Sequence, residues 1–250
     1  MSISIITITY NAEKYIERTI QSVIQQTYSP IEYIIIDGES KDSTLSIVEK
    51  YKDKISVIVS EKDKGIYDAM NKGLRLAKNE YVLFMNAGDE IYDKNTLQKI
   101  FEKQENADIY YGETLFLDLE RNSLGIRSEA TPLRLPQKLN WKHLQLGLMV
   151  CHQAIIVKKN ITEEYDLHHL FSADIDWIIK ALKKAKTVVN AENIIAIYLQ
   201  GGFSRKHLWR SLKDRFLILS KHYGFFKTCF NHIKIIMRAI LFLIKKRKTY

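Results

Sequence analysis

The sequence has few of the residues that cross-link or break a chain. Its 250 residues include 2 cysteines, 3 prolines and 10 glycines. Cys151 and Cys229 stand far apart without a CxxC spacing, which argues against a disulfide framework and against a cysteine-based zinc site. With 46% hydrophobic residues, this composition is typical of a folded chain in a reducing compartment.

The sequence also shows no pattern typical of a targeting segment or of a membrane anchor. The first residues carry no basic stretch, and Ser and Thr interrupt the apolar run at 3–8, which predicts a first strand and not a signal peptide. Near the C-terminus the longest charge-free apolar run covers residues 239–244, far below the roughly 20 residues of a spanning helix. We therefore expect a cytoplasmic chain without a transmembrane anchor.

Acidic residues are nearly absent from the last fifth of the chain. Residues 201–250 hold 13 Lys and Arg against one acid, Asp214, a net charge of +12, whereas residues 1–200 sum to −3. The overall charge of +9 therefore belongs to a basic tail. We expect a catalytic body at residues 1–204 and a basic helical tail at residues 205–250.

What is present in the first hundred residues is an alternation of short β-branched runs with amphipathic stretches. The apolar strands are near-continuous, as in parallel sheets covered on both faces. This pattern predicts a doubly wound, mostly parallel α/β sheet. The expected strands cover residues 3–8, 31–36, 55–59 and 81–85, and the helices cover 13–26, 44–51 and 67–77.

The second half of the body has a weaker pattern. Short strands are expected at 109–112, 114–119, 154–157, 187–189 and 194–198, with a helix at 172–184. We divide the body into a nucleotide-binding part at about 1–107 and an acceptor part at 108–204.

Polar residues follow the predicted parallel strands at the point where each strand ends. They are Thr9 with Asn11, Asp37, residues 61–65 and residues 86–89. Ligands of doubly wound sheets bind at the carboxyl ends of the strands, so these four loops should converge on one site. The first of them lacks the GxGxxG pattern, which disfavours a dinucleotide-binding site.

Each carboxylate on these loops has two interpretations. Asp37 could accept hydrogen bonds from a base or a ribose, or it could belong to the turn that starts the next helix. Asp89 could meet a divalent cation held mainly by two phosphates, or it could complete an ordinary strand-to-helix turn.

Taken together, the motifs resemble those of glycosyltransferase family 2, the inverting enzymes of the GT-A fold. The resemblance rests on the order and spacing of Thr9-Tyr10-Asn11, the segment 37–44, the segment 63–73 and Asn86-Ala87-Gly88-Asp89. Similar proteins build bacterial capsule, exopolysaccharide or O-antigen from nucleotide-activated sugars. The resemblance implies that Thr9, Asn11 and Asn86 help to hold the nucleotide, that Asp37 contacts its base with Asp63 beside it, and that Asp89 binds Mg or Mn. The loop departs from many relatives because it has one aspartate where they have two or three.

The second half resembles the family more loosely, in segments 151–153, 173–177 and 201–204. There Ala173-Asp174 takes the place of the family's Glu-Asp pair, which implies that Asp174 is the base. Inversion needs one such carboxylate to take the acceptor proton. Asp174 could instead be an ordinary acid at a helix start, and Asp176 competes for the role. His152 could contact the acceptor or the donor, and Trp141 and Trp177 could stack on a sugar, but such residues are more often structural and we assign none of them to catalysis.

The tail predicts two amphipathic helices, at 207–220 and 225–244, followed by the basic cluster 245–248. Such helices suit an anionic cytoplasmic membrane surface, which would suit a lipid-linked acceptor. Packing on the body or in a homodimer is the alternative. We expect no nucleic-acid binding, because no signature of that class accompanies the charge.

The leading hypothesis is a transferase that moves a sugar from a nucleotide diphosphate, with UDP the expected carrier, to a glycan or lipid-linked acceptor. A nucleotidyltransferase would need a glycine-rich triphosphate loop early in the chain, and none is present. An inactive, membrane-tethered scaffold of the same fold is the alternative from another class.

Overall fold

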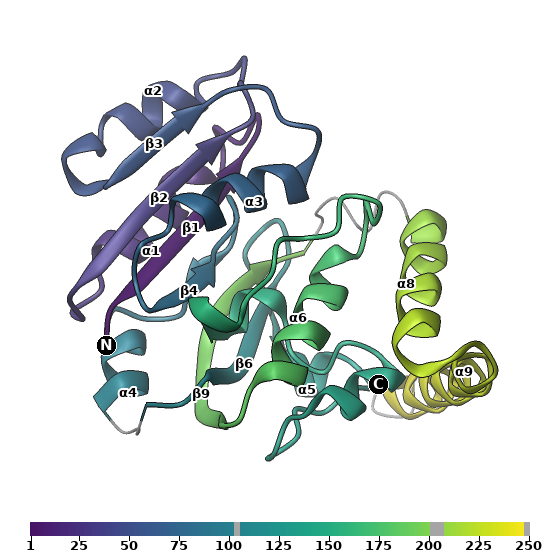
Figure 1. The fold of residues 1–250 in the computed structure, drawn as a ribbon. Coiled ribbons are helices and arrows are strands. Elements are labelled where there is room, and N and C mark those ends of the chain that lie inside the picture. Colours follow the sequence, from purple (N-terminus) through teal and green to yellow (C-terminus); the bar gives the residue numbers. More distant parts are fainter. Residues whose placement is uncertain (103–105, 201–207, 248–250) are drawn as a thin grey trace.

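A computed structural model describes residues 1–102, 106–200 and 208–247 of the chain. The described residues form one nine-stranded sheet, flanked by helices and followed by two C-terminal helices (Figure 1). The strand order is β3-β2-β1-β4-β8-β6-β9-β5, and β7 pairs with β6. The mostly parallel, doubly wound sheet of the GT-A type expected from the sequence is confirmed.

The first half of the sheet is parallel throughout. Strands β3, β2, β1 and β4 pair in parallel, and the helices between them follow the predicted order. The elements are β1 (Ile3–Thr9), α1 (Ile16–Ile24), β2 (Ile31–Asp37), α2 (Thr44–Glu49), η1 (Lys52–Lys54), β3 (Val57–Ser60), α3 (Ile66–Leu76) and β4 (Tyr81–Phe84). All of β1 and β4 is buried, which explains why their sequences are apolar without alternation.

The second half continues the sheet with mixed pairing. Its elements are β5 (Glu90–Ile91), α4 (Thr96–Glu102), β6 (Ile109–Leu117), β7 (Ser123–Ile126), α5 (Arg127–Ala130), η2 (Trp141–Leu146), η3 (His152–Ala154), β8 (Ile155–Lys158), η4 (Lys159–Ile161), α6 (Ala173–Lys184) and β9 (Val188–Leu199). Strand β8 pairs antiparallel with both β4 and β6, while β6 and β9 run parallel.

Two predicted strand breaks are absent from the structure. The pairs expected at 109–112 with 114–119 and at 187–189 with 194–198 are each one strand, β6 and β9. The register between them shifts on both sides of Glu113, and a Cβ on Gly112 would lie 2.5 Å from the Asn193 carbonyl oxygen. The glycine therefore marks a bulge where two backbones approach closely, not the end of a strand.

Helix α3 packs against β1 and β2. Gly73 makes this possible, because a Cβ there would lie 2.4 Å from Cγ2 of Ile6. In Figure 1, α3 and α6 lie on the face of the sheet turned toward the viewer. The side chains that face each other from these helices are therefore candidates for one site.

The two helices predicted for the tail are present as α8 (Leu208–Tyr223) and α9 (Phe225–Arg247). Gly224, with a φ of +88°, joins them, a conformation that favours glycine. Helix α8 runs beside α6, and α9 lies at the outer side of the molecule (Figure 1). The proposed boundary at residue 204 lies outside the described residues.

None of the helices in the described part of the chain has both the length and the apolar character needed to cross a membrane.

Candidate functional site

The loops after β1 and β2 tie the ends of these strands together. Thr9 stands opposite Asp37 in the parallel register, and the Gly38 N–H donates to the Thr9 carbonyl oxygen at 2.9 Å. Asn11 adopts a φ of +47°, which asparagine tolerates better than most residues. Its Oδ1 accepts from the Lys41 N–H at 2.8 Å. Thr9, Asn11 and Asp37 therefore lie at one edge of the sheet.

The Asp37 carboxylate is buried and holds its own loop. It accepts hydrogen bonds from the Ser40 N–H at 2.9 Å, from the Ser40 hydroxyl, and from the Ser60 hydroxyl at 2.7 Å. Such donors offset the cost of burying a charge. The turn role that the sequence allowed is present, and the contact with a base stays a prediction.

The loop after β3 lies against the loop after β2. A Cβ on Gly38 would lie 2.4 Å from Oδ2 of Asp63 and 3.3 Å from the ring of Tyr10, so only glycine fits between them without a shift. Asp63 Oδ1 accepts from the Gly65 N–H at 2.8 Å, while the Tyr10 ring is 62% exposed. Three of the four predicted loops thus meet at one place, beneath an exposed aromatic ring.

The fourth loop begins with Asn86, directly after β4. The Ala87 N–H donates to the carbonyl oxygen of Ile8 in β1 at 3.1 Å, which brings this loop beside Thr9. Two oxygens here, Oγ1 of Thr9 and Oδ1 of Asn86, are buried and have no hydrogen-bond partner within the described chain. A buried oxygen without a partner is unusual and costly. Both oxygens are therefore candidates to bind a ligand.

Asp89 is buried beneath the same loop. Its Oδ2 accepts from the Gln153 amide at 2.7 Å, and the Leu199 N–H also donates to the carboxylate. Burial raises the pKa of Asp89 to about 7 despite these hydrogen bonds. The nearby charge of Glu90 raises the pKa of Asp89 further.

The loop fits a hard divalent cation only in part. Carboxylate and amide oxygens are the ligand type that Mg or Mn prefers, and Asp89 with Asn86 supplies them. However, among residues 1–102, 106–200 and 208–247 no three His, Cys, Asp or Glu side chains gather as a metal site. A cation held here would therefore need most of its ligands from a bound phosphate group.

Asp174 lies in the first turn of α6, on the same side of the sheet as α3. Its Oδ1 accepts from the Tyr67 hydroxyl of α3 at 3.1 Å. Desolvation raises the pKa of Asp174, while the positive charge of Arg215 on α8 and the Tyr67 hydrogen bond work in the opposite direction. Asp174 as a residue is only half-buried, so it lies at the edge of the packed body with a carboxyl whose pKa is raised.

Asp176, the competing acid, is committed to structure. Its Oδ2 lies 2.8 Å from Nζ of Lys180, and its Oδ1 lies 2.7 Å from Nε2 of His222 on α8. The side chain is only 1% exposed. Although burial alone would raise it, these hydrogen bonds and charges hold the pKa of Asp176 well below its usual range. The geometry favours Asp174 over Asp176 as a base.

An aromatic cluster supports this side of the site from below. The rings of Tyr67 and Trp177 both stack on the ring of Tyr165, with centroid distances of 5.6 and 5.3 Å. His152 is buried against the Tyr165 hydroxyl at 2.6 Å, and burial lowers the pKa of His152 to about 3. Trp141 stacks on Tyr223 of α8. His152 and Trp177 are thus packed within the body, and Trp141 joins the body to α8.

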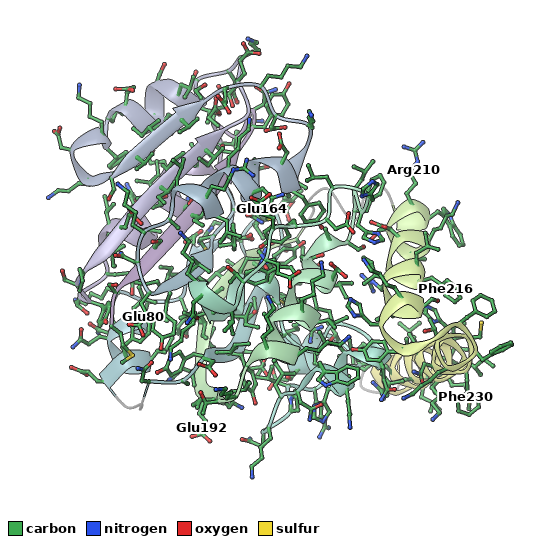
Figure 2. All side chains as sticks on the ribbon, viewed as in Figure 1. Glu80, Glu164, Glu192, Arg210, Phe216 and Phe230 are labelled. Atoms are coloured by element: carbon green, nitrogen blue, oxygen red, sulfur yellow. The ribbon has the colours of Figure 1, made fainter. Side chains whose placement is uncertain are left out.

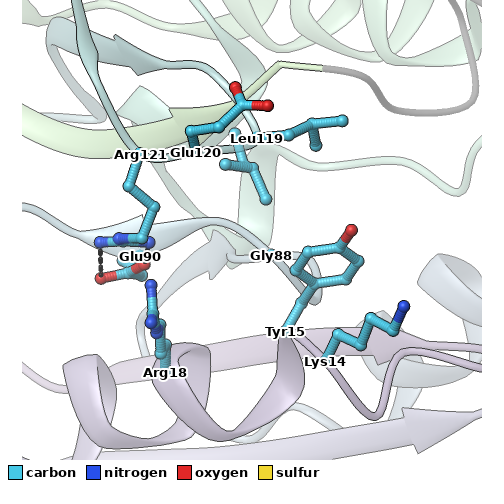
Figure 3. Close-up of a pocket in the computed structure, with 9 residues that line it drawn as sticks. Lys14, Tyr15, Arg18, Gly88, Glu90, Leu119, Glu120 and Arg121 are labelled. Carbon is cyan, nitrogen blue, oxygen red and sulfur yellow. Dashed lines mark hydrogen bonds and ion pairs between the residues drawn. The ribbon is translucent and has the colours of Figure 1, made fainter.

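A pocket of about 240 Å³ adjoins the loop of Asp89. Figure 3 shows Gly88 at its centre, with Lys14 and Arg18 on one side and the tip of the β6–β7 hairpin on the other. Arg121 at that tip forms an ion pair with Glu90 at 2.6 Å. Lys14 and Arg18 have no ion-pair partner in the described part of the chain. Glu120 also lines the pocket, so its lining of three cations and two acids carries a small net positive charge beside the proposed metal loop.

Sequence reasoning missed four residues of this region: Tyr67, Gln153, Asp214 and Arg215. Tyr67 and Gln153 lie inside segments that the sequence singled out, but nothing in the pattern assigned them a contact. Asp214 stood out as the one acid of the basic tail, which was a usable signal. No signal in the sequence singled out Arg215, because it is one of 13 Lys and Arg residues in the tail.

Comparison with known proteins places these features in context. The model of Glycosyl transferase family 2 matches residues 4–165, which include every proposed donor-site residue. The "PGL/p-HBAD biosynthesis glycosyltransferase" of Mycobacterium bovis is 26% identical over 201 residues, covering 77% of this chain and 74% of that protein.

TuaG of Bacillus subtilis, a protein assigned to teichuronic acid biosynthesis as a glycosyltransferase, is 26% identical over 225 residues, covering 86% of each chain. Among solved structures, residues 1–349 of S. aureus TarS in complex with UDP-GlcNAc superpose with a TM-score of 0.66 at 19% identity, covering 95% of this chain and 72% of that one.

Proposed function

The chain belongs to glycosyltransferase family 2, and from this premise we propose that it transfers a sugar from a UDP-sugar to a glycan or lipid-linked acceptor in the synthesis of a cell-surface polysaccharide. One observation carries the donor site. Two buried oxygens without partners, on Thr9 and Asn86, lie where the loops after four parallel strands converge.

We assign these oxygens to the nucleotide of the donor. The Thr9 hydroxyl and the Asn86 amide oxygen would gain the hydrogen bonds that they lack in the free chain. Asn11 lies in the same loop as the exposed Tyr10 ring, which offers a surface for a base. Asp63 lies beside Gly38 on the opposite wall.

Asp37 would contact the base only after a local change. Its Oδ1 is engaged by the Ser40 hydroxyl, which can rotate away because it is a single-bond rotor. We therefore expect Asp37 to hold the loop in the free chain and to accept from the base in the complex.

Asp89 is the residue that we assign to a Mg or Mn ion, together with the diphosphate. The ion would supply positive charge where the leaving diphosphate becomes negative. Asp89 is suited to this because its carboxylate is buried next to Asn86 and Gly88 of the same loop. Lys14 and Arg18 in the adjoining pocket would add positive charge beside the same leaving group.

Asp174 is the proposed base. It would accept the proton of the acceptor hydroxyl as that oxygen attacks the anomeric carbon on the face opposite the diphosphate, which inverts the configuration. The raised pKa of Asp174, caused mainly by desolvation, makes its carboxylate a better proton acceptor than an exposed aspartate.

The tail is proposed to hold the enzyme at the inner face of the cell membrane. Exposed apolar side chains follow helical spacing along α9: Phe226, Phe230, Ile233, Met237 and Ile240. Lys227, Lys234 and Arg238 form the adjoining stripe, which suits anionic headgroups. A lipid-linked acceptor would be reached from this surface, and the names of the mycobacterial and Bacillus relatives agree with a cell-surface product.

Release of UDP from a panel of UDP-sugars, measured with and without an acceptor extract, tests this proposal. We expect UDP release that depends on the metal. The additional release caused by the acceptor, which reports sugar transfer, should be abolished in Asp174→Asn. Asp53→Asn in the exposed 3-10 helix η1 is the control with the same charge change. No release from UDP-, GDP- or dTDP-sugars by folded protein would favour a scaffold instead.

A further inference from the structure

Helix α8 of the tail holds the segment that carries the proposed base. Asp214 on α8 accepts from the N–H groups of Phe171 at 2.9 Å and Ser172 at 3.1 Å, both through Oδ2. Its Oδ1 lies 2.6 Å from Nδ1 of His169. These residues lead directly into α6, where Asp174 is in the first turn.

A second contact fixes the same segment. The hydroxyl of Ser172 lies 3.2 Å from that of Ser211, one turn before Asp214 on α8. Ser211, Asp214 and Ser172 are all buried. Figure 1 shows α8 running alongside α6. The backbone before Asp174 is therefore held by α8 at three polar groups from which water is excluded.

The next residue of α8 acts on the carboxylate itself. Arg215 is close enough to Asp174 for its positive charge to lower the pKa of that carboxyl. Its Nε is buried without a hydrogen-bond partner in the described chain. The Nε atom of Arg215 is therefore covered by protein and does not face solvent.

The remaining ionisable neighbours of Asp174 come from two other elements. Tyr67 of α3 donates to Asp174, and Tyr165 precedes α6 in the chain. Burial and the nearby Asp174 charge raise the pKa of both tyrosines well above the usual value, so both stay neutral at ordinary pH. Arg215 is then the cation that acts on Asp174 from α8.

We propose that α8 is part of the catalytic centre: Asp214 is a positioning residue that fixes the start of α6 and thereby the place of Asp174, and Arg215, the next residue of α8, is a second positioning residue that acts through its positive charge. The proposal rests on the proposed function of Asp174. It assigns the first helix of the basic tail to the reaction and leaves α9 to the membrane.

Arg215→Gln tests the charge. Without the guanidinium the acid limb of the pH profile of kcat should move to higher pH by about one unit, so that kcat on that limb falls about tenfold. The KM for the UDP-sugar should stay within about twofold. Arg215→Lys should restore the profile, since it returns the charge.

Lys213→Gln is the matched control, because it removes one positive charge from an exposed position of α8 two residues before Arg215. Its profile should match the wild type. A profile of Arg215→Gln that coincides with those of wild type and Lys213→Gln would overturn the role of Arg215.

Asp214→Ala tests the clamp by hydrogen–deuterium exchange of the full chain, a readout that needs no activity. The amides of Phe171 and Ser172 should exchange at least tenfold faster, while amides of β1 and β4 keep their protection. Asp214→Asn retains one acceptor oxygen and serves if the alanine variant does not fold. Unchanged protection of both amides would contradict the clamp.

Asp174→Asn separates the two proposals. If it transfers sugar like wild type, the assigned base is wrong and the proposed mechanism fails. If it is inactive while Arg215→Gln and Asp214→Asn keep the wild-type kcat and pH profile, only the inference about α8 fails.

Discussion

The unsatisfied hydroxyl of Thr9 makes a two-sided prediction. Valine has nearly the shape of threonine, so Thr9→Val removes the hydroxyl and leaves the packing of β1 intact. A buried polar group without a partner costs roughly 1–3 kcal/mol. We therefore expect the free energy of unfolding of the free chain to rise by about 1 kcal/mol in Thr9→Val. Nucleotide binding should weaken at the same time, by about fivefold, because one hydrogen bond to the ligand is lost.

Urea unfolding and calorimetric titration with UDP and Mn measure the two effects on the same samples. Thr228→Val is the control: its Oγ1 is also buried without a partner, but it lies in α9. That variant should gain stability and keep the wild-type affinity for UDP. A Thr9→Val protein that is less stable than wild type, or that binds UDP equally well, would refute the reasoning.

Three further predictions follow from other contacts. Asp176→Asn should lower the free energy of unfolding by roughly 3 kcal/mol at pH 7. Because the pKa of Asp176 is depressed in the folded chain, the loss of stability relative to wild type should be full above the unfolded pKa of about 4 and should shrink as the pH falls below it. Urea titrations at several pH values measure this dependence. Gly38→Ala should weaken UDP binding by about threefold, because its Cβ would lie 2.4 Å from Oδ2 of Asp63 and displace that carboxylate; equal affinity by calorimetry would contradict a place for Asp63 beside the nucleotide. Phe226→Ser with Phe230→Ser should release the chain from vesicles containing anionic lipid in a flotation assay, since 87% and 58% of these side chains are exposed; unchanged flotation would assign α9 to another partner.

The fold was predictable because the sequences of the first strands are continuously apolar, which indicates that both of their faces are buried. Runs such as Tyr33-Ile34-Ile35-Ile36 are apolar on both faces, and polar residues follow at each strand end. The convergence of the four loops follows from that topology alone. The strand breaks expected at Gly112 and near residue 190 were wrong, because a β-bulge and the end of a strand have the same local composition.

Long-range partners could not be read from local patterns. Gln153 is 64 residues from Asp89, and Tyr67 is 107 residues from Asp174. Periodicity indicates which face of an element is buried, but not which side chain of another element it meets. The sequence treated the tail as one unit, either on the membrane or packed on the body. In the structure α8 packs on α6 and α9 contacts η2, while apolar side chains of α9 such as Phe230 stay exposed (Figure 2).

The donor site is tested most directly by calorimetric titration of UDP in the presence and absence of Mn, on wild type and Asp89→Asn. The asparagine keeps an acceptor for the Gln153 amide, so the loop should stay folded. The account predicts Mn-dependent binding of UDP by wild type and loss of that dependence in Asp89→Asn. No binding of UDP by folded wild type, or identical Mn dependence in both proteins, would contradict it.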